Sequence, residues 1–194
     1  MKHIAVIGES LFDTKPLCQI WNKRYLKKAR FSTVLKRLEG SVLYSKKIGR
    51  MIKADMQSSD YDFIIVVRDL DAGRSNHKQW STVQDWYSEL SEHFPNNILL
   101  LNVQELEALI LADIETFNAI YKTSIKFPGN PEALNSPKDF LISATHGKRK
   151  RFEVKDNQQL IPRLDFTKVE AKCKFYRDFI VELEQLLSVK PSFK

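Results

Sequence analysis

The sequence has few of the residues that build disulfide frameworks and zinc sites. Its 194 residues include two cysteines, Cys18 and Cys173, and four histidines, with no Cys-x-x-Cys pair and no histidine spacing typical of metal ligands. These absences argue against a disulfide scaffold and against a structural zinc site. We therefore expect a reduced, intracellular compartment, the cytoplasm.

Long apolar runs are also missing. No segment approaches the ~20 apolar residues that a membrane-spanning helix needs, so we expect no membrane partner. The first apolar stretch, His3–Ile7, is too short for the core of a signal peptide and is stopped by Gly8 and Glu9. No internal repeat is visible.

What the chain does have is enough apolar material for one core, together with an excess of positive charge. Apolar residues make up 43% and charged residues 28% of the sequence, which predicts a globular domain of ordinary size. Lys and Arg outnumber Asp and Glu by 31 to 24, and eleven of these basic residues fall between Lys23 and Lys53. A polyanion would fit such a patch, although a solvated helical face has the same composition.

Short apolar segments alternate with segments of helical periodicity. We expect strands at residues 3–7, 31–35, 63–67 and 97–103, and helices at about 16–28, 41–57, 80–93 and from 105 onward. Strands that alternate with helices of ten or more residues predict right-handed crossovers and a parallel sheet. The sequence therefore predicts an α/β fold with a mainly parallel central sheet of about four strands, flanked by helices on both faces.

The pattern changes after residue 126. Proline and glycine cluster between 127 and 137, which predicts a loop-rich segment. A short helix is expected at about 138–144, and a last helix where apolar residues recur every three or four positions from Val169 to Leu187. We expect residues 1–126 to form the α/β core and 127–194 to form a helical C-terminal extension packed on the same domain. That apolar stripe favours core packing over an oligomer seam, so the oligomeric state stays open.

The segment Tyr61–Gly73, YDFIIVVRDLDAG, places two acids after a buried strand. Side chains alternate along an extended backbone, so Asp69 and Asp71 are expected to project the same way, roughly 6 to 7 Å apart. Two carboxylates that close repel each other unless a cation lies between them. A solvated turn or a helix cap has the same composition.

Other acids follow other expected strands. Glu9 comes after the first strand, and Glu105 and Glu107 come after the fourth. If the strands are parallel, these acids share one edge of the sheet with Asp69 and Asp71, at the carboxyl ends where ligands bind. Oxygen ligands without His or Cys suit Mg²⁺ or Mn²⁺ rather than zinc. Two such ions can activate water and stabilise the leaving oxygen of a phosphodiester.

A Glu after the first strand and an Asp-x-Asp after a later one resemble the Toprim fold of primases, topoisomerases and overcoming-lysogenisation-defect nucleases. More closely, VIGESLFD, VVRDLDAG, VQELEALILAD and the NPEALNSPK to THGKRKR segment resemble the Toprim-like family known as domain of unknown function 4276. The resemblance covers nearly the whole chain. It implies metal-dependent phosphodiester chemistry at Glu9, Asp69 and Asp71, with Glu107 completing the metal shell.

Chemistry suggests a role for each of these residues. Glu9, Asp69 and Asp71 would bind the metal, and Glu9 would also move a proton at the scissile group if neighbouring carboxylates raise its pKa. Lys78, or Arg74, would offset charge that develops on the phosphoryl oxygens, although both are also typical surface cations. A carboxylate such as Glu107 also suits the start of a helix for electrostatic reasons alone.

A basic run follows the short helix expected at 138–144 and consists of Lys148, Arg149, Lys150 and Arg151. Beside a catalytic edge, such a run would contact a phosphate backbone, whereas alone it is typical of a solvated loop. The leading hypothesis is a Mg²⁺- or Mn²⁺-dependent nuclease acting on DNA or RNA. The resemblance further implies the effector of a phage-defence or toxin system that works with an ATPase partner. The alternatives are a non-catalytic nucleic-acid- or protein-binding module and a receiver-like signalling domain.

Overall fold

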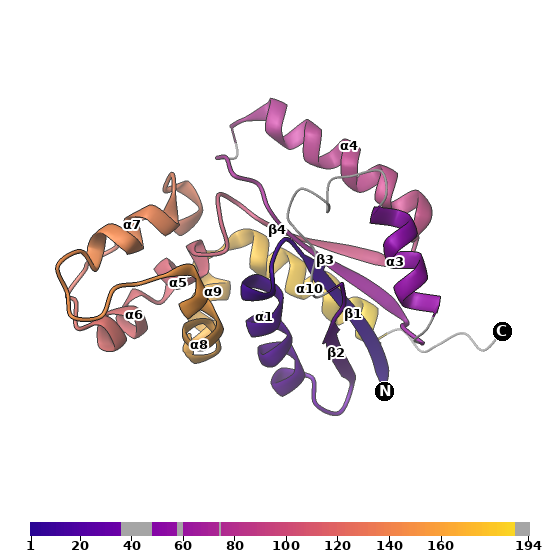
Figure 1. Cartoon of the computed structure of the whole chain (residues 1–194), viewed down its shortest axis with the longest axis horizontal. Coiled ribbons are helices and arrows are strands. Elements are labelled where there is room, and N and C mark those ends of the chain that lie inside the picture. The colour runs from indigo at the N-terminus through magenta and orange to yellow at the C-terminus, as the bar shows by residue number, and fades with distance from the viewer. Residues whose placement is uncertain (36–47, 58–59, 74, 189–194) are drawn as a thin grey trace.

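The computed structural model describes residues 1–35, 48–57, 60–73 and 75–188, and in these ranges the chain forms one parallel sheet (Figure 1). The strands are β1 (Lys2–Gly8), β2 (Ala29–Thr33), β3 (Phe63–Asp69) and β4 (Asn97–Asn102). Their order in the sheet is β2-β1-β3-β4, and each neighbouring pair is parallel. The predicted α/β class with a four-stranded parallel sheet is confirmed.

Helices connect the strands and continue after the last one. In the described ranges they are α1 (Leu11–Arg24), α3 (Ile48–Gln57), α4 (His77–His93), α5 (Ala108–Ala112), α6 (Ile114–Tyr121), α7 (Pro137–Ala144), α8 (Asn157–Leu160), α9 (Phe166–Lys172) and α10 (Lys174–Ser188). None of the described helices is both long and apolar enough to cross a membrane. The helix expected at 41–57 is described only from Ile48, because residues 41–47 lie outside the described ranges.

Apolar residues of β1 and β3 alternate between the two faces of the sheet, as the pleat requires. Ile4 and Ile65 belong to the core that includes residues of α1 and α10, whereas Ala5 and Val66 belong to a second core with residues of α3 and α4. Both faces are thus covered by helices, as predicted (Figure 1). This explains why the strands are uninterrupted apolar runs rather than alternating sequences.

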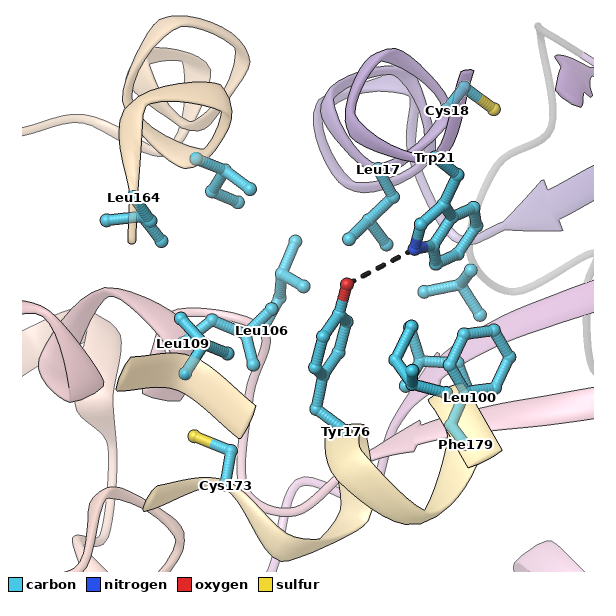
Figure 2. Packing of buried hydrophobic residues seen from close by; sticks show 14 of the residues in the cluster. Leu17, Cys18, Trp21, Leu100, Leu106, Leu109, Leu164, Cys173, Tyr176 and Phe179 are labelled. Atoms are coloured by element: carbon cyan, nitrogen blue, oxygen red, sulfur yellow. Dashed lines mark hydrogen bonds between the residues drawn. The ribbon is translucent and has the colours of Figure 1, made fainter. Parts of the chain in front are cut away.

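The larger core joins the two ends of the chain. Trp21 of α1 donates its indole N–H to the hydroxyl of Tyr176 of α10 at 3.2 Å (Figure 2). The Trp21 ring also lies 5.3 Å from the ring of Phe179, measured between centroids. Buried Trp and Tyr are stabilised when their polar atoms pair in this way. The C-terminal helix α10 is therefore part of the core of the sheet.

The single last helix predicted around 169–187 is wrong, because the structure has two helices there. The backbone of Cys173 is extended, with φ −102° and ψ 98°, and separates α9 from α10. Each helix buries its own apolar face: α9 packs on α5 and α10 packs on β4. The buried carboxylate of Glu132 accepts the backbone N–H of Phe175 at 2.8 Å, which satisfies a donor in the first turn of α10. Both helices keep the three-to-four spacing, so the periodicity alone did not reveal the break.

Candidate functional site

The strand order reverses between β1 and β3, because the chain passes from β1 to β2 on one side and later to β3 on the other. In open parallel sheets, ligands bind beyond the carboxyl ends of the strands at such a reversal. Gly8 ends β1 and is paired in register with Val67. A Cβ at Gly8 would lie 2.7 Å from Cγ2 of the buried Thr14 and 3.2 Å from the carbonyl oxygen of Val67. Glycine is therefore required where β1, β3 and α1 meet.

Glu9 and Asp69 lie together at this edge of the sheet. Glu9 directly follows Gly8, and Asp69 is the last residue of the adjacent strand β3. The extended backbone expected as far as Asp71 is not found, because Asp71 has φ 53°. The backbone N–H of Asp71 donates to the carbonyl of Gln104 at 2.9 Å, and Gln104 also has positive φ, at 65°. The simple alternation that would align Asp69 with the exposed Asp71 therefore does not apply.

Asp13, which the sequence-based reasoning placed only near the start of a helix, joins these acids. Ser10 caps α1 by accepting the backbone N–H of Phe12 at 3.1 Å, and its hydroxyl donates to Oδ2 of Asp13 at 2.7 Å. The negative charge of Asp13 raises the pKa of both Glu9 and Asp69. The Ser-x-x-Asp spacing was visible in the sequence, but it indicates a capped helix and not a position beside β3.

Burial and mutual repulsion raise the pKa values of the acids at this edge. Burial raises the pKa of Glu9 to about 7, with further contributions from the charges of Asp71 and Asp13. Burial also raises the pKa of Asp69 well above its ordinary range, and the charge of Asp13 adds to this effect. A 2.9 Å hydrogen bond from Nδ2 of Asn102 to Asp69 acts in the opposite direction. These carboxylates consequently hold protons more strongly than free acids, unless a cation is added.

Glu105 and Glu107 have different partners. The backbone N–H of Lys138 donates to Glu105 at 2.9 Å, and the Lys138 ammonium lies 2.8 Å from the same carboxylate. Glu105 therefore caps α7 rather than the helix that follows it in sequence. Glu107 is only 4% exposed and accepts a hydrogen bond from Nδ2 of Asn157 at 2.9 Å. The charge of Glu107 raises the pKa of Asp69, which places Glu107 on the side of the acidic cluster.

Two cations flank the acids. Lys138 has a raised pKa because of its hydrogen bond to Glu105 and, more weakly, because of the charges of Glu107 and Asp69. The buried Arg68 lies over the ring of Trp86, 4.4 Å from its centroid, and its charge lowers the pKa of Glu9. Lys78, by contrast, is exposed on the first turn of α4. Arg74 lies outside the described residues.

The basic run Lys148–Arg151 is exposed and follows the C-terminal end of α7. Lys150 lies over the ring of Tyr121, 4.7 Å from its centroid, and Arg151 contacts Nδ1 of His146 at 3.0 Å. Lys138 is at the opposite end of α7, and eight helical residues span roughly 12 Å. The basic run therefore lies about one helix length from the acids.

The oxygen-only donor set at the sheet edge fits a hard divalent cation such as Mg²⁺ or Mn²⁺. Positive charge there would also offset the repulsion among Glu9, Asp13 and Asp69. Within the described residues, no three His, Cys, Asp or Glu side chains lie close enough together to hold a metal ion as they stand. Glu9, Asp69 and Glu107 are the residues that would hold the ion, with Asp71 added from its exposed loop.

These features define an α/β protein with a parallel sheet and an acidic site at its strand reversal. The family model described as Domain of unknown function (DUF4276) matches residues 8–184. The chain belongs to this family, as the sequence motifs implied. Neither the curated proteins nor the solved structures include a match to this chain.

Proposed function

We propose that the protein is a Toprim-like nuclease that uses Mg²⁺ or Mn²⁺ to hydrolyse phosphodiester bonds of DNA or RNA. The observation that supports this most directly is the grouping of Glu9, Asp13, Asp69 and Glu107 around the strand reversal. Folding brings these acids together from three separate parts of the sequence although their charges repel. A divalent cation at this position would offset that repulsion.

The proposed roles follow from what each side chain can reach. A bound metal would supply the positive charge that activates water and stabilises the leaving oxygen. Asp69, Glu9 and Glu107 would hold the metal. Glu9, with a pKa of about 7, would also accept or return a proton at an oxygen of the scissile group near neutral pH.

A lysine would offset charge that develops on the phosphoryl oxygens. Lys138 is the better candidate because its ammonium is held 2.8 Å from Glu105, beside the acids. Lys78 remains a second candidate, since it lies on the helix that follows the Asp-x-Asp loop. Lys148, Arg149, Lys150 and Arg151 would contact the phosphate backbone of the nucleic acid farther from the cleaved bond.

The family resemblance also motivates a biological setting for this activity. The chain would be the effector of a phage-defence or toxin system and would work with an ATPase partner in the cytoplasm. Co-expression with a candidate ATPase, followed by purification of the complex through a tag on either protein, would test this partnership.

The direct test is cleavage of labelled tRNA and plasmid DNA with Mn²⁺, comparing the wild-type protein with the Asp69→Ala, Asp71→Ala double variant. Loss of two proposed metal ligands is expected to reduce cleavage at least ~100-fold. Glu115→Ala is a matched control, because Glu115 is an exposed acid on α6 whose partner is Lys168. Equal cleavage by the wild type and the double variant would contradict the proposal.

Thermal melts with and without Mn²⁺ separate this proposal from a non-catalytic binding module. A ligand that binds only the folded state raises its stability by RT ln(1 + [L]/Kd). We expect Mn²⁺ to raise the melting temperature of the wild type but not that of the double variant. An unchanged wild-type melt, together with nucleic-acid binding that does not need metal, would favour the non-catalytic module.

A further inference from the structure

A buried asparagine from the C-terminal half of the chain reaches the candidate site. Asn157 is the first residue of α8 and is 0% exposed. Its Nδ2 donates a 2.9 Å hydrogen bond to Oε1 of Glu107, although the two residues are 50 positions apart in sequence. Helix α8 packs against α1, the helix whose first turn carries Asp13. The amide therefore lies between the C-terminal helices and the acids.

Stability alone does not account for an asparagine at this position. The carbonyl oxygen of Asn157 has no hydrogen-bond partner among the described residues, and it is buried. A buried polar atom left in this state costs about 1–3 kcal/mol. An apolar side chain of similar size would fill the same space without that cost. The hydrogen bond to Glu107 is thus the one described interaction of this amide that an apolar residue would lose.

We propose that Asn157 is a positioning residue of the acidic site, whose amide fixes the Glu107 carboxylate beside Asp69 and Asp13 for binding a divalent cation. The hydrogen bond occupies Oε1 and leaves Oε2 available for the ion. This inference rests on the proposed function, because the cation is what Glu107 is oriented for. The C-terminal helices would then complete the site as well as the core.

The test measures binding of Mn²⁺ alone to the full-length chain, by electron paramagnetic resonance or calorimetry, without nucleic acid. Loss of a hydrogen bond to a metal-ligating carboxylate typically weakens metal binding by about ten- to a hundredfold. We expect Asn157→Leu to show that loss while its metal-free melting temperature stays the same or rises. Asn157→Ala, which adds no bulk, is the second variant. Gln159→Leu, at an exposed amide on the same helix, is the control and should change neither quantity.

A double-variant cycle shows whether Asn157 acts through Glu107. In a Glu107→Gln background, Asn157→Leu should change Mn²⁺ affinity less than about twofold, since coupled residues are not additive. Equal affinity of wild type and the Asn157 variants would overturn the inference and leave the proposed metal site standing. Affinity lost only in proportion to metal-free stability would also overturn it. A wild type that binds no Mn²⁺ would overturn both.

Discussion

Two carboxylates at different ends of α5, Asp113 and Asp69, lie in opposite electrostatic surroundings. Asp113 is 1% exposed, and burial alone would raise its pKa. Its Oδ2 accepts hydrogen bonds from the backbone N–H of Asp165 at 2.9 Å and from the hydroxyl of Thr116 at 2.6 Å, and its Oδ1 lies 2.9 Å from the Lys168 ammonium. These partners more than offset burial and hold the pKa of Asp113 below its usual range.

Asp69 has no comparable compensation among its described partners. Burial and the charges of Asp13, Glu107 and Glu9 raise its pKa, and the hydrogen bond from Asn102 opposes them only in part. Folding therefore stabilises the charge of Asp113 and opposes that of Asp69. A buried acid that folding makes harder to ionise is typical of binding and catalytic sites, whereas a fully paired acid is typical of a structural contact. This difference yields predictions of opposite sign.

The largest effect is expected from Asp113→Ala. The substitution leaves the donors of Asp165, Thr116 and Lys168 without their buried acceptor. We expect the free energy of unfolding to fall by about 3 kcal/mol at neutral pH. Urea denaturation monitored by tryptophan fluorescence measures this change, because Trp21 lies in the core that α9 and α10 complete.

Glu115→Ala is the control for this substitution. Glu115 also contacts Lys168, at 3.2 Å, but its side chain is exposed. Exposed ion pairs contribute little to stability, so no measurable change is expected. A similar loss from both variants would show that the buried hydrogen bonds of Asp113 are not what stabilises this region.

The fold class could be predicted because each strand is a short apolar run and both faces of the sheet are covered. This reasoning located β3 within two residues, since the expected 63–67 became Phe63–Asp69. It did not locate the divisions of the later helices. Asp113 interrupts the helix expected from 105, and Cys173 interrupts the last one. Both breaks depend on tertiary contacts that leave the apolar spacing unchanged.

The candidate site could be predicted only where the chain direction fixes the position. Parallel strands require that residues following their carboxyl ends share an edge, which was enough to group Glu9 with Asp69. Lys138, Asp13 and Asn157 reach the same edge from helices whose packing is not encoded in local spacing. Predicting these residues would have required the packing of α7, α1 and α8 around the site.

The next effect is expected from Asp69→Asn, and its sign is opposite to that of Asp113→Ala. Asparagine keeps the oxygen that accepts from Asn102 but removes a charge that burial and neighbouring acids oppose. We expect the metal-free protein to gain about 1.5 kcal/mol at mildly alkaline pH, as is common when a functional group is neutralised. Thermal melts in the presence of a chelator measure this gain. A loss comparable to that of Asp113→Ala would mean that the Asp69 charge is compensated after all.

The smallest effect concerns Glu9 and the dependence of stability on pH. Its pKa is about 7 in the folded protein, against an ordinary value of 4.5, so the folded state binds more protons than the unfolded state between these values. The contribution of Glu9 to stability is therefore complete below the lower value and is lost as pH rises through the higher one. For Asp113, whose pKa is lowered, stability is instead lost as pH falls through the folded pKa.

We expect the metal-free wild type to lose about 1 kcal/mol of unfolding free energy through Glu9 between mildly acidic and mildly alkaline pH, after allowing for solvent screening of a half-buried group. Glu9→Gln removes this contribution and leaves those of Asp69 and Glu107, so its pH profile should fall less steeply. Urea denaturation across this range, with a chelator present, measures both profiles. Equal slopes for the two proteins would show that Glu9 ionises in the folded state as easily as in the unfolded chain, and that repulsion at the strand reversal does not extend to it.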